Sequence, residues 1–152
     1  MDKIVFITGA SSGIGAGCAR KFASQGASLI LNARNVDKLN GLKEELEKQY
    51  GAKIYLLPFD VRDRKAATSA LESLPKEWQS IDILVNNAGL VIGTDKEQEG
   101  SLDEWDIVID TNIKALLAMT RLIVPGMVER KRGHIINIGS IAVSYTHLRA
   151  HE

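Results

Sequence analysis

The chain of 152 residues is 45% hydrophobic and 25% charged, a composition typical of a folded globular domain and not of a disordered protein. Its 19 basic residues balance its 19 acidic ones, so no net charge favours nucleic acid or a membrane surface as a partner. A single cysteine, Cys18, excludes an internal disulfide, and no apolar run is long enough for a secretory signal or a membrane span. We therefore expect a cytoplasmic protein that binds neither nucleic acid nor membranes.

Apolar runs and helix-like periodicity alternate along the chain. The β-branched runs predict strands over residues 3–8, 28–33, 53–59, 81–86 and 134–139. Apolar residues at helical spacing predict helices over 13–26, 36–46 and 66–74, and a longer helix that begins near residue 101. Strands that alternate with helices in this way predict an α/β fold, a Rossmann-like, doubly wound parallel sheet with right-handed crossovers.

Individual residues add local detail to this outline. Ile14 and Cys18 fall on the apolar stripe of the first helix, and we expect Cys18 to be buried there. Pro58 suits a strand at the sheet edge or the exit from a strand. Ser101 begins a capping box with Glu104. Pro125, late in the long helix, is expected to bend or interrupt it.

The stretch "TGASSGIG", residues 8–15, lies between the first strand and the first helix. A glycine-rich turn there lets backbone approach a phosphate closely and points helix N–H groups at the anion. A purely structural turn is the alternative, because the glycine spacing differs from the usual dinucleotide fingerprint. The candidate cofactor contacts in this turn are Gly9, Ser11, Ser12, Gly13, Ile14 and Gly15.

The end of the second predicted strand indicates which dinucleotide would bind. Folds that prefer NAD usually place an acidic residue there to hold the ribose 2′-hydroxyl. This chain has Ala33 followed by Arg34, so no carboxylate repels a 2′-phosphate and a guanidinium can bind it. The alternative is a solvated arginine at a helix start. The sequence favours NADP.

The order of motifs resembles the short-chain dehydrogenases/reductases from about residue 3 to residue 142. "TGASSGIG" is similar to the family's glycine motif, "NNAG" (86–89) to its second cofactor motif, and "GHIINIGS" (133–140) to its serine-bearing strand. The longer stretches around them look most like the NADP-dependent 3-hydroxy acid (serine/allo-threonine) dehydrogenases. This resemblance implies hydride transfer between NADP and a secondary alcohol of a small molecule, a homotetrameric enzyme, and a sheet of which this chain holds the first five strands.

The resemblance also implies roles for individual residues. Asp60 and Val61 would contact the adenine, whereas Asn112 would act in a proton relay and Ser140 would hydrogen-bond the substrate's oxygen. The residues that would line the cofactor cleft are Asn87, Ala88 and Gly89.

The last ten residues, "VSYTHLRAHE", do not fit the family pattern. Tyr145 follows Ser140 too soon to be the family's catalytic tyrosine, and Arg149 stands where a lysine is required. His147 and His151 have metal-ligand spacing but no third ligand nearby, so we expect no metal site. The segment resembles translated sequencing adapter, so we predict a domain over 1–142 and a non-native tail over 143–152. Such a chain lacks the Tyr-x-x-x-Lys pair and is expected to be inactive.

Two other functions remain open at this point. A non-catalytic NADP-binding sensor would have the same fold, and it would be favoured if the full gene lacked the Tyr-x-x-x-Lys pair. A methyltransferase also carries a glycine turn after its first strand, but it would favour an acidic residue at position 33 in place of Ala33.

Overall fold

The computed structural model describes residues 2–93 and 96–140. Helices and strands alternate through this part of the chain, as the sequence predicts, and the strands are shorter than the apolar runs that predicted them. The elements are β1 (Ile4–Ile7), α1 (Gly13–Ser24), β2 (Ser28–Leu31), α2 (Val36–Tyr50), β3 (Ile54–Leu56), α3 (Arg64–Glu72), η1 (Lys76–Trp78), β4 (Ile83–Asn86), η2 (Glu97–Glu99), α4 (Leu102–Ile109), η3 (Asp110–Ala115), α5 (Leu116–Glu129) and β5 (His134–Asn137).

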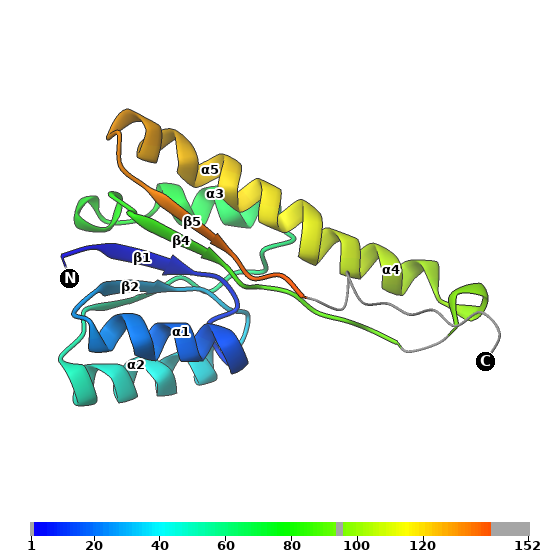
Figure 1. The fold of residues 1–152 in the computed structure, drawn as a ribbon, viewed down its shortest axis with the longest axis horizontal. Coiled ribbons are helices and arrows are strands. Elements are labelled where there is room, and N and C mark those ends of the chain that lie inside the picture. Colours follow the sequence, from blue (N-terminus) through cyan, green and yellow to red (C-terminus); the bar gives the residue numbers. More distant parts are fainter. Residues whose placement is uncertain (1, 94–95, 141–152) are drawn as a thin grey trace.

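The five strands form one parallel sheet in the order β3-β2-β1-β4-β5 (Figure 1). β1 lies at the centre, where Phe6 pairs in register with Ile30 of β2 and Leu84 of β4. The chain builds outward from β1 to β3 and then crosses to the other side of β1 for β4. In such sheets the ligand crevice lies beyond the carboxyl ends of the strands where the order reverses, which here is between β1 and β4. The predicted Rossmann-like fold is confirmed.

Alternate residues of the strands bury their side chains on opposite faces of the sheet. On one face Val5 and Ile7 pack with the helices α1 and α2, and on the other Phe6 packs with α3 and α5. All three side chains are fully buried. Coverage on both faces explains why the strands are continuous apolar runs in the sequence. Figure 1 shows the two layers of helices on either side of the sheet.

Two local features differ from what the sequence pattern alone suggests. Ile14 is 62% exposed, because it lies in the first turn of α1 beyond the edge of the sheet, whereas Cys18 one turn later packs partly against the core. Pro125 does not interrupt the helix, since α5 continues through it to Glu129. Buried Ile123 and Met127 anchor the helix to the sheet on either side of the proline, and this burial offsets the missing hydrogen bond.

Two other local expectations are confirmed. Pro58 follows β3, which is an edge strand. The Ser101 side chain accepts a hydrogen bond from the Glu104 N–H at 3.4 Å and so caps the start of α4.

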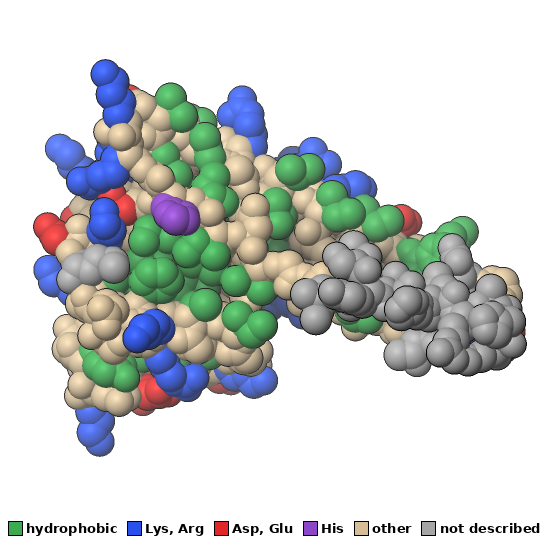
Figure 2. Space-filling view, in the orientation of Figure 1, with side chains coloured by type: hydrophobic (Ala, Val, Ile, Leu, Met, Phe, Trp, Pro, Cys, Tyr) green, Lys and Arg blue, Asp and Glu red, His purple; other side chains and the backbone are tan. Residues whose placement is uncertain are grey.

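β5 forms the other edge of the sheet, where it pairs with β4 and with no further strand of the described residues. Its side chains are half-buried or exposed, unlike those of β1, β2 and β4. Figure 2 shows hydrophobic side chains gathered over this side of the sheet and along α5. Within the described residues no helix is long and apolar enough to cross a membrane.

Candidate functional site

The glycine turn joins β1 to α1 at the carboxyl edge of the sheet. Gly9 and Gly13 have φ angles of 63° and 52°, in the left-handed region that side chains disfavour. Gly15 has an ordinary φ but no room, because a Cβ there would collide with the Gly9 carbonyl oxygen and lie 2.5 Å from Nδ2 of Asn87. The turn therefore requires glycine at all three positions, two for conformation and one for close packing.

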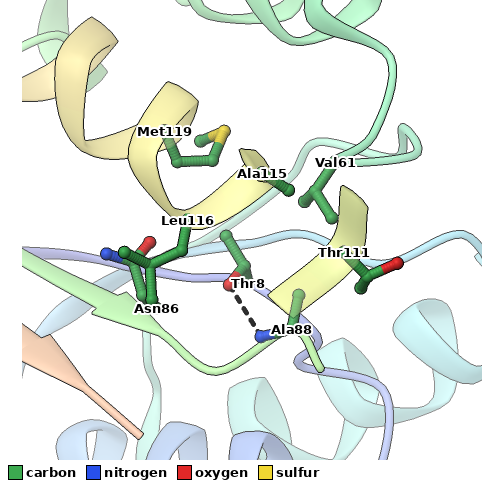
Figure 3. Close-up of a pocket in the computed structure, with 8 residues that line it drawn as sticks. All are labelled: Thr8, Val61, Asn86, Ala88, Thr111, Ala115, Leu116 and Met119. Atoms are coloured by element: carbon green, nitrogen blue, oxygen red, sulfur yellow. Dashed lines mark hydrogen bonds between the residues drawn. The ribbon is translucent and has the colours of Figure 1, made fainter. Parts of the chain in front are cut away.

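A hydrogen-bond network ties this turn to the segment that follows β4. Nδ2 of Asn87 donates to the carbonyl oxygens of Thr8 and Gly9 at 3.1 and 3.0 Å. The Thr8 hydroxyl accepts from the N–H groups of Asn87 and Ala88, both at 3.0 Å, and Figure 3 shows the second of these bonds. The side chains of Asn87 and Thr8 thus hold the glycine turn and the segment after β4 together. Thr8, which is buried, was not predicted from the sequence.

The first turn of α1 is open to an anion. Its N-cap residue, Ser12, is extended, and the Ser12 side chain makes no capping hydrogen bond in the described structure. Ser12, Gly13 and Ile14 are exposed, Ser11 is half-buried, and the first turn contains no acidic residue. The first N–H groups of a helix have no partner within it, and the helix dipole adds positive potential at this end. The turn is fixed by its hydrogen bonds to the segment after β4, and its helix N-terminus has no side-chain cap, so it can bind a phosphate.

Charged side chains flank the carboxyl ends of β2 and β3. Arg34 is exposed two residues after the buried Asn32. Asp60 follows β3 and is held by the Arg62 guanidinium, whose Nη2 lies 2.7 Å from Oδ2 and whose Nε lies 3.1 Å from both carboxylate oxygens. The hydrogen bonds from Arg62 lower the pKa of the Asp60 carboxyl, and the charge of Arg34 adds to this effect. Arg62 was not predicted from the sequence, although its charge and its place two residues after Asp60 could have suggested the pair.

Asn32 fixes the position of the segment that carries Asp60. Its buried Nδ2 donates to the carbonyl oxygens of Leu57 and Phe59 at 3.0 and 3.1 Å. These two bonds join the end of β2 to the chain that leaves β3, so Arg34 and Asp60 are held on the same side of the sheet edge. Val61 is buried beneath them, so its side chain belongs to the core.

Asn112 lies in η3, a π-helical segment between α4 and α5. Its Oδ1 accepts from the Leu90 N–H at 2.9 Å, and its Nδ2 donates to the Leu90 carbonyl at 2.8 Å. A Cβ on Gly89 would lie 3.3 Å from the same Oδ1. The amide of Asn112 is therefore committed to the loop after β4, and π-helical irregularity inside an α-helix often accompanies a functional site.

A cavity of about 10 Å³ lies under this edge, between β1, β4 and the η3–α5 helix (Figure 3). It is lined by Thr8, Val61, Asn86, Ala88, Thr111, Ala115, Leu116 and Met119. Such a volume holds about one water molecule. It is too small for a substrate or cofactor, so a ligand would lie on the open edge above it.

Ser140 is exposed three residues after β5, at the same edge of the sheet. The structure thus places every predicted site residue along one edge, and it joins Thr8, Asn87 and Ala88 directly. Tyr145, His147, Arg149 and His151 lie outside the described residues. Within residues 2–93 and 96–140, no three His, Cys, Asp or Glu side chains form a group that could hold a metal ion.

Residues 3–150 match the family described as short chain dehydrogenase. The chain belongs to this family. Among curated relatives, NADP-dependent 3-hydroxy acid dehydrogenase YdfG of Escherichia coli strain K12 is 49% identical over 142 residues, which cover 93% of this chain and 56% of the relative. Sulfoacetaldehyde reductase 2 of Chromohalobacter salexigens is 40% identical over 152 residues, 99% of this chain and 60% of its own length. The chain thus spans little more than half the length of these relatives.

Solved structures of the family agree with this fold. The crystal structure of serine dehydrogenase from Escherichia coli has a TM-score of 0.88 at 48% identity, covering 95% of this chain and 65% of that one. A closed form of serine dehydrogenase complexed with NADP⁺ has a TM-score of 0.86 at 46% identity, covering 95% and 56%. The matched family and these relatives are dehydrogenases, so they do not favour the sensor or the methyltransferase.

Proposed function

We propose that this short-chain dehydrogenase binds NADP at the carboxyl edge of β1, β2 and β3. The observation that carries the proposal is an exposed guanidinium, Arg34, directly after the buried Ala33, on the same edge as the uncapped first turn of α1. The pyrophosphate would lie against Gly13 and the N-terminus of α1, while Arg34 would pair with the 2′-phosphate. Asp60 and the backbone beside Val61 would face the adenine, and Ala88 and Gly89 would line the cleft towards the nicotinamide.

The cofactor preference is tested by Arg34→Ala in the complete enzyme, with residues 1–142 joined to the continuation of the source gene. The dissociation constant of NADP should rise by about tenfold or more, because a charge-assisted contact is lost, whereas that of NAD should change little. Lys38→Ala is the matched control, since it removes a positive charge four residues later, in the first turn of α2. Equal weakening of both cofactors by Arg34→Ala would contradict the assignment.

We infer further that the complete enzyme transfers a hydride between NADP and the secondary alcohol of a small 3-hydroxy acid such as serine or allo-threonine. When bound, the nicotinamide supplies the hydride acceptor, and the protein has to orient the substrate and handle its proton. Similarity to 3-hydroxy acid dehydrogenase YdfG and to serine dehydrogenase supports this substrate class. The exposed Ser140 would hydrogen-bond the substrate's oxygen, and Asn112 would hold the loop that bears the cleft and take part in the proton relay.

The role of Ser140 is tested in the same complete enzyme. Ser140→Ala should lower kcat for 3-hydroxy acids and leave the dissociation constant of NADP unchanged, because the side chain would contact substrate and not cofactor. Ser69→Ala, an exposed serine on α3, is the control. Full turnover by the Ser140 variant would show that the assignment is wrong. The 152-residue chain itself should have no turnover, since its Tyr145 and Arg149 do not replace a Tyr-x-x-x-Lys pair.

We also infer that the complete enzyme is a homotetramer and that it is cytoplasmic. Leu117 and Val128, on the outer face of α5, are 61% and 68% exposed, and apolar side chains exposed on one face support association with other subunits. Light scattering on the complete enzyme tests the first inference, and a monomer would contradict it.

A further inference from the structure

Arg62 forms an ion pair with Asp60 close to the proposed cofactor site. Besides the three side-chain contacts to Asp60, its backbone N–H donates to Oδ1 of Asp60 at 3.0 Å. The two side chains are 32% and 31% exposed, so each is mostly shielded from water. One carboxylate is thus held from two directions by a residue only two positions away.

Arg34 is a second cation on this side of the sheet edge, because the Asn32 amide joins the end of β2 to the chain that leaves β3. Its charge acts on Asp60, yet Arg34 makes no hydrogen bond or ion pair with any residue in the described ranges. The Arg62 side chain already contacts both oxygens of the Asp60 carboxylate, and its backbone N–H adds a further bond to Oδ1. Here the partner is Arg62, and the Arg34 side chain stays exposed to solvent.

We propose that Arg62 is a positioning residue for NADP selectivity: by holding the Asp60 carboxylate, it prevents Asp60 from pairing with Arg34 and leaves the Arg34 guanidinium available to a 2′-phosphate. This inference rests on the proposed function, in which Arg34 binds that phosphate. The phosphate is an anion, so a neighbouring free carboxylate would both compete for Arg34 and repel the ligand. Arg62 removes both effects at once.

The fold favours Arg62 over Arg34 as the partner of Asp60. A tight turn follows Asp60, in which the Asp63 N–H donates to the Asp60 carbonyl at 2.9 Å, and the Asp63 side chain then caps α3 by accepting from the Ala66 N–H. The backbone on both sides of Arg62 is therefore fixed, and its guanidinium is already oriented towards Asp60 before any ligand binds. Arg62 also faces the charge of Asp110 in η3, which already pairs with Lys114 at 2.7 Å.

The test measures dissociation constants of NADP and NAD for variants of the complete enzyme and compares their ratio. Both cofactors carry the same adenine, so the ratio does not change with general damage to the adenine pocket. Arg62→Met should reduce the preference for NADP by about tenfold, as Asp60 takes Arg34 from the phosphate. Adding Asp60→Asn should restore the preference to within about threefold of wild type, because the amide cannot pair ionically with Arg34. Arg64→Met, at an exposed arginine two positions on, removes the same charge and should leave the ratio unchanged.

Each outcome decides the question. An unchanged ratio in Arg62→Met, or a reduced ratio that Asp60→Asn does not restore, overturns the role of Arg62. If Arg34→Ala still weakens the binding of NADP more than that of NAD in that case, the proposed function stands and only this inference fails. If Arg34→Ala shows no selective loss, the cofactor assignment itself is wrong and the inference falls with it. A loss of preference in Arg64→Met equal to that in Arg62→Met would show that net charge, and not the pairing, sets the ratio.

Discussion

Replacing Thr8 with valine should destabilise the glycine turn without changing the shape of the core. Thr8 is 2% exposed, and its hydroxyl accepts from the N–H groups of Asn87 and Ala88 at 3.0 Å and contacts the Val85 carbonyl at 3.4 Å. Valine has nearly the same volume but no hydroxyl. Two N–H groups of the "NNAG" segment would therefore lose their acceptor at once.

The size of the effect follows from those two bonds. An N–H group left without a partner in the protein costs about 1–3 kcal/mol, and partial burial puts each of these two in the lower half of that range. The total is about 2–4 kcal/mol. For a chain of about 150–250 residues, 1 kcal/mol corresponds to about 2–4 °C, so Tm should fall by about 4–16 °C.

Thermal unfolding of the complete enzyme, followed by circular dichroism, measures this shift. Thr8→Ser retains the hydroxyl and should keep most of the stability. Thr68→Val removes a hydroxyl that bonds only to the Arg64 carbonyl within α3, so it controls for the loss of an ordinary hydroxyl. If Thr8→Val unfolds within about 2 °C of Thr8→Ser, these hydrogen bonds do not stabilise the turn, and the assigned role of Thr8 is wrong.

Three further predictions follow from the site and the sheet edge. Asn112→Ala leaves both polar groups of the Leu90 backbone without their partner, so Tm should fall by several degrees; an unchanged Tm would contradict the bracing role. Because Arg62 lowers the pKa of Asp60, Arg62→Met should cost less than about 1 kcal/mol of stability for this partly exposed pair. The loss should be present above the ordinary pKa of 3.8 and shrink as pH falls towards the lowered pKa; denaturant titrations at pH 7 and pH 3 check this, and a loss that grows in acid would have the wrong sign. The 152-residue chain should give little soluble monomer by size exclusion, because β5 pairs on one side only among the described residues and carries half-buried isoleucines. Deleting 143–152 should not worsen this behaviour, and a soluble, active monomer would contradict the prediction.

Sequence alone was sufficient for the features that depend on local pattern. Continuous apolar runs and helical periodicity predicted five parallel strands and the helices between them, since burial on both faces leaves no alternation in a strand. Gly9 and Gly13 were predicted as parts of a glycine-rich turn, and both adopt left-handed φ angles, which only glycine adopts without strain. The position of Arg34 after β2 could also be predicted, because it depends only on where an apolar run ends.

Tertiary structure decided two kinds of feature. Some join segments that are distant in the sequence, and in others packing overrides a local preference. Nothing near Thr8 in the sequence indicates that its hydroxyl bonds to residues 79 and 80 positions later. The π-helical segment around Asn112 forms where the helix meets the loop at Leu90, and Pro125 stays within a helix because buried neighbours hold it there. Arg62 and Arg34 are equally good partners for Asp60 by charge alone. The turn after β3 decides between them, because it fixes the direction of one guanidinium and leaves the other exposed.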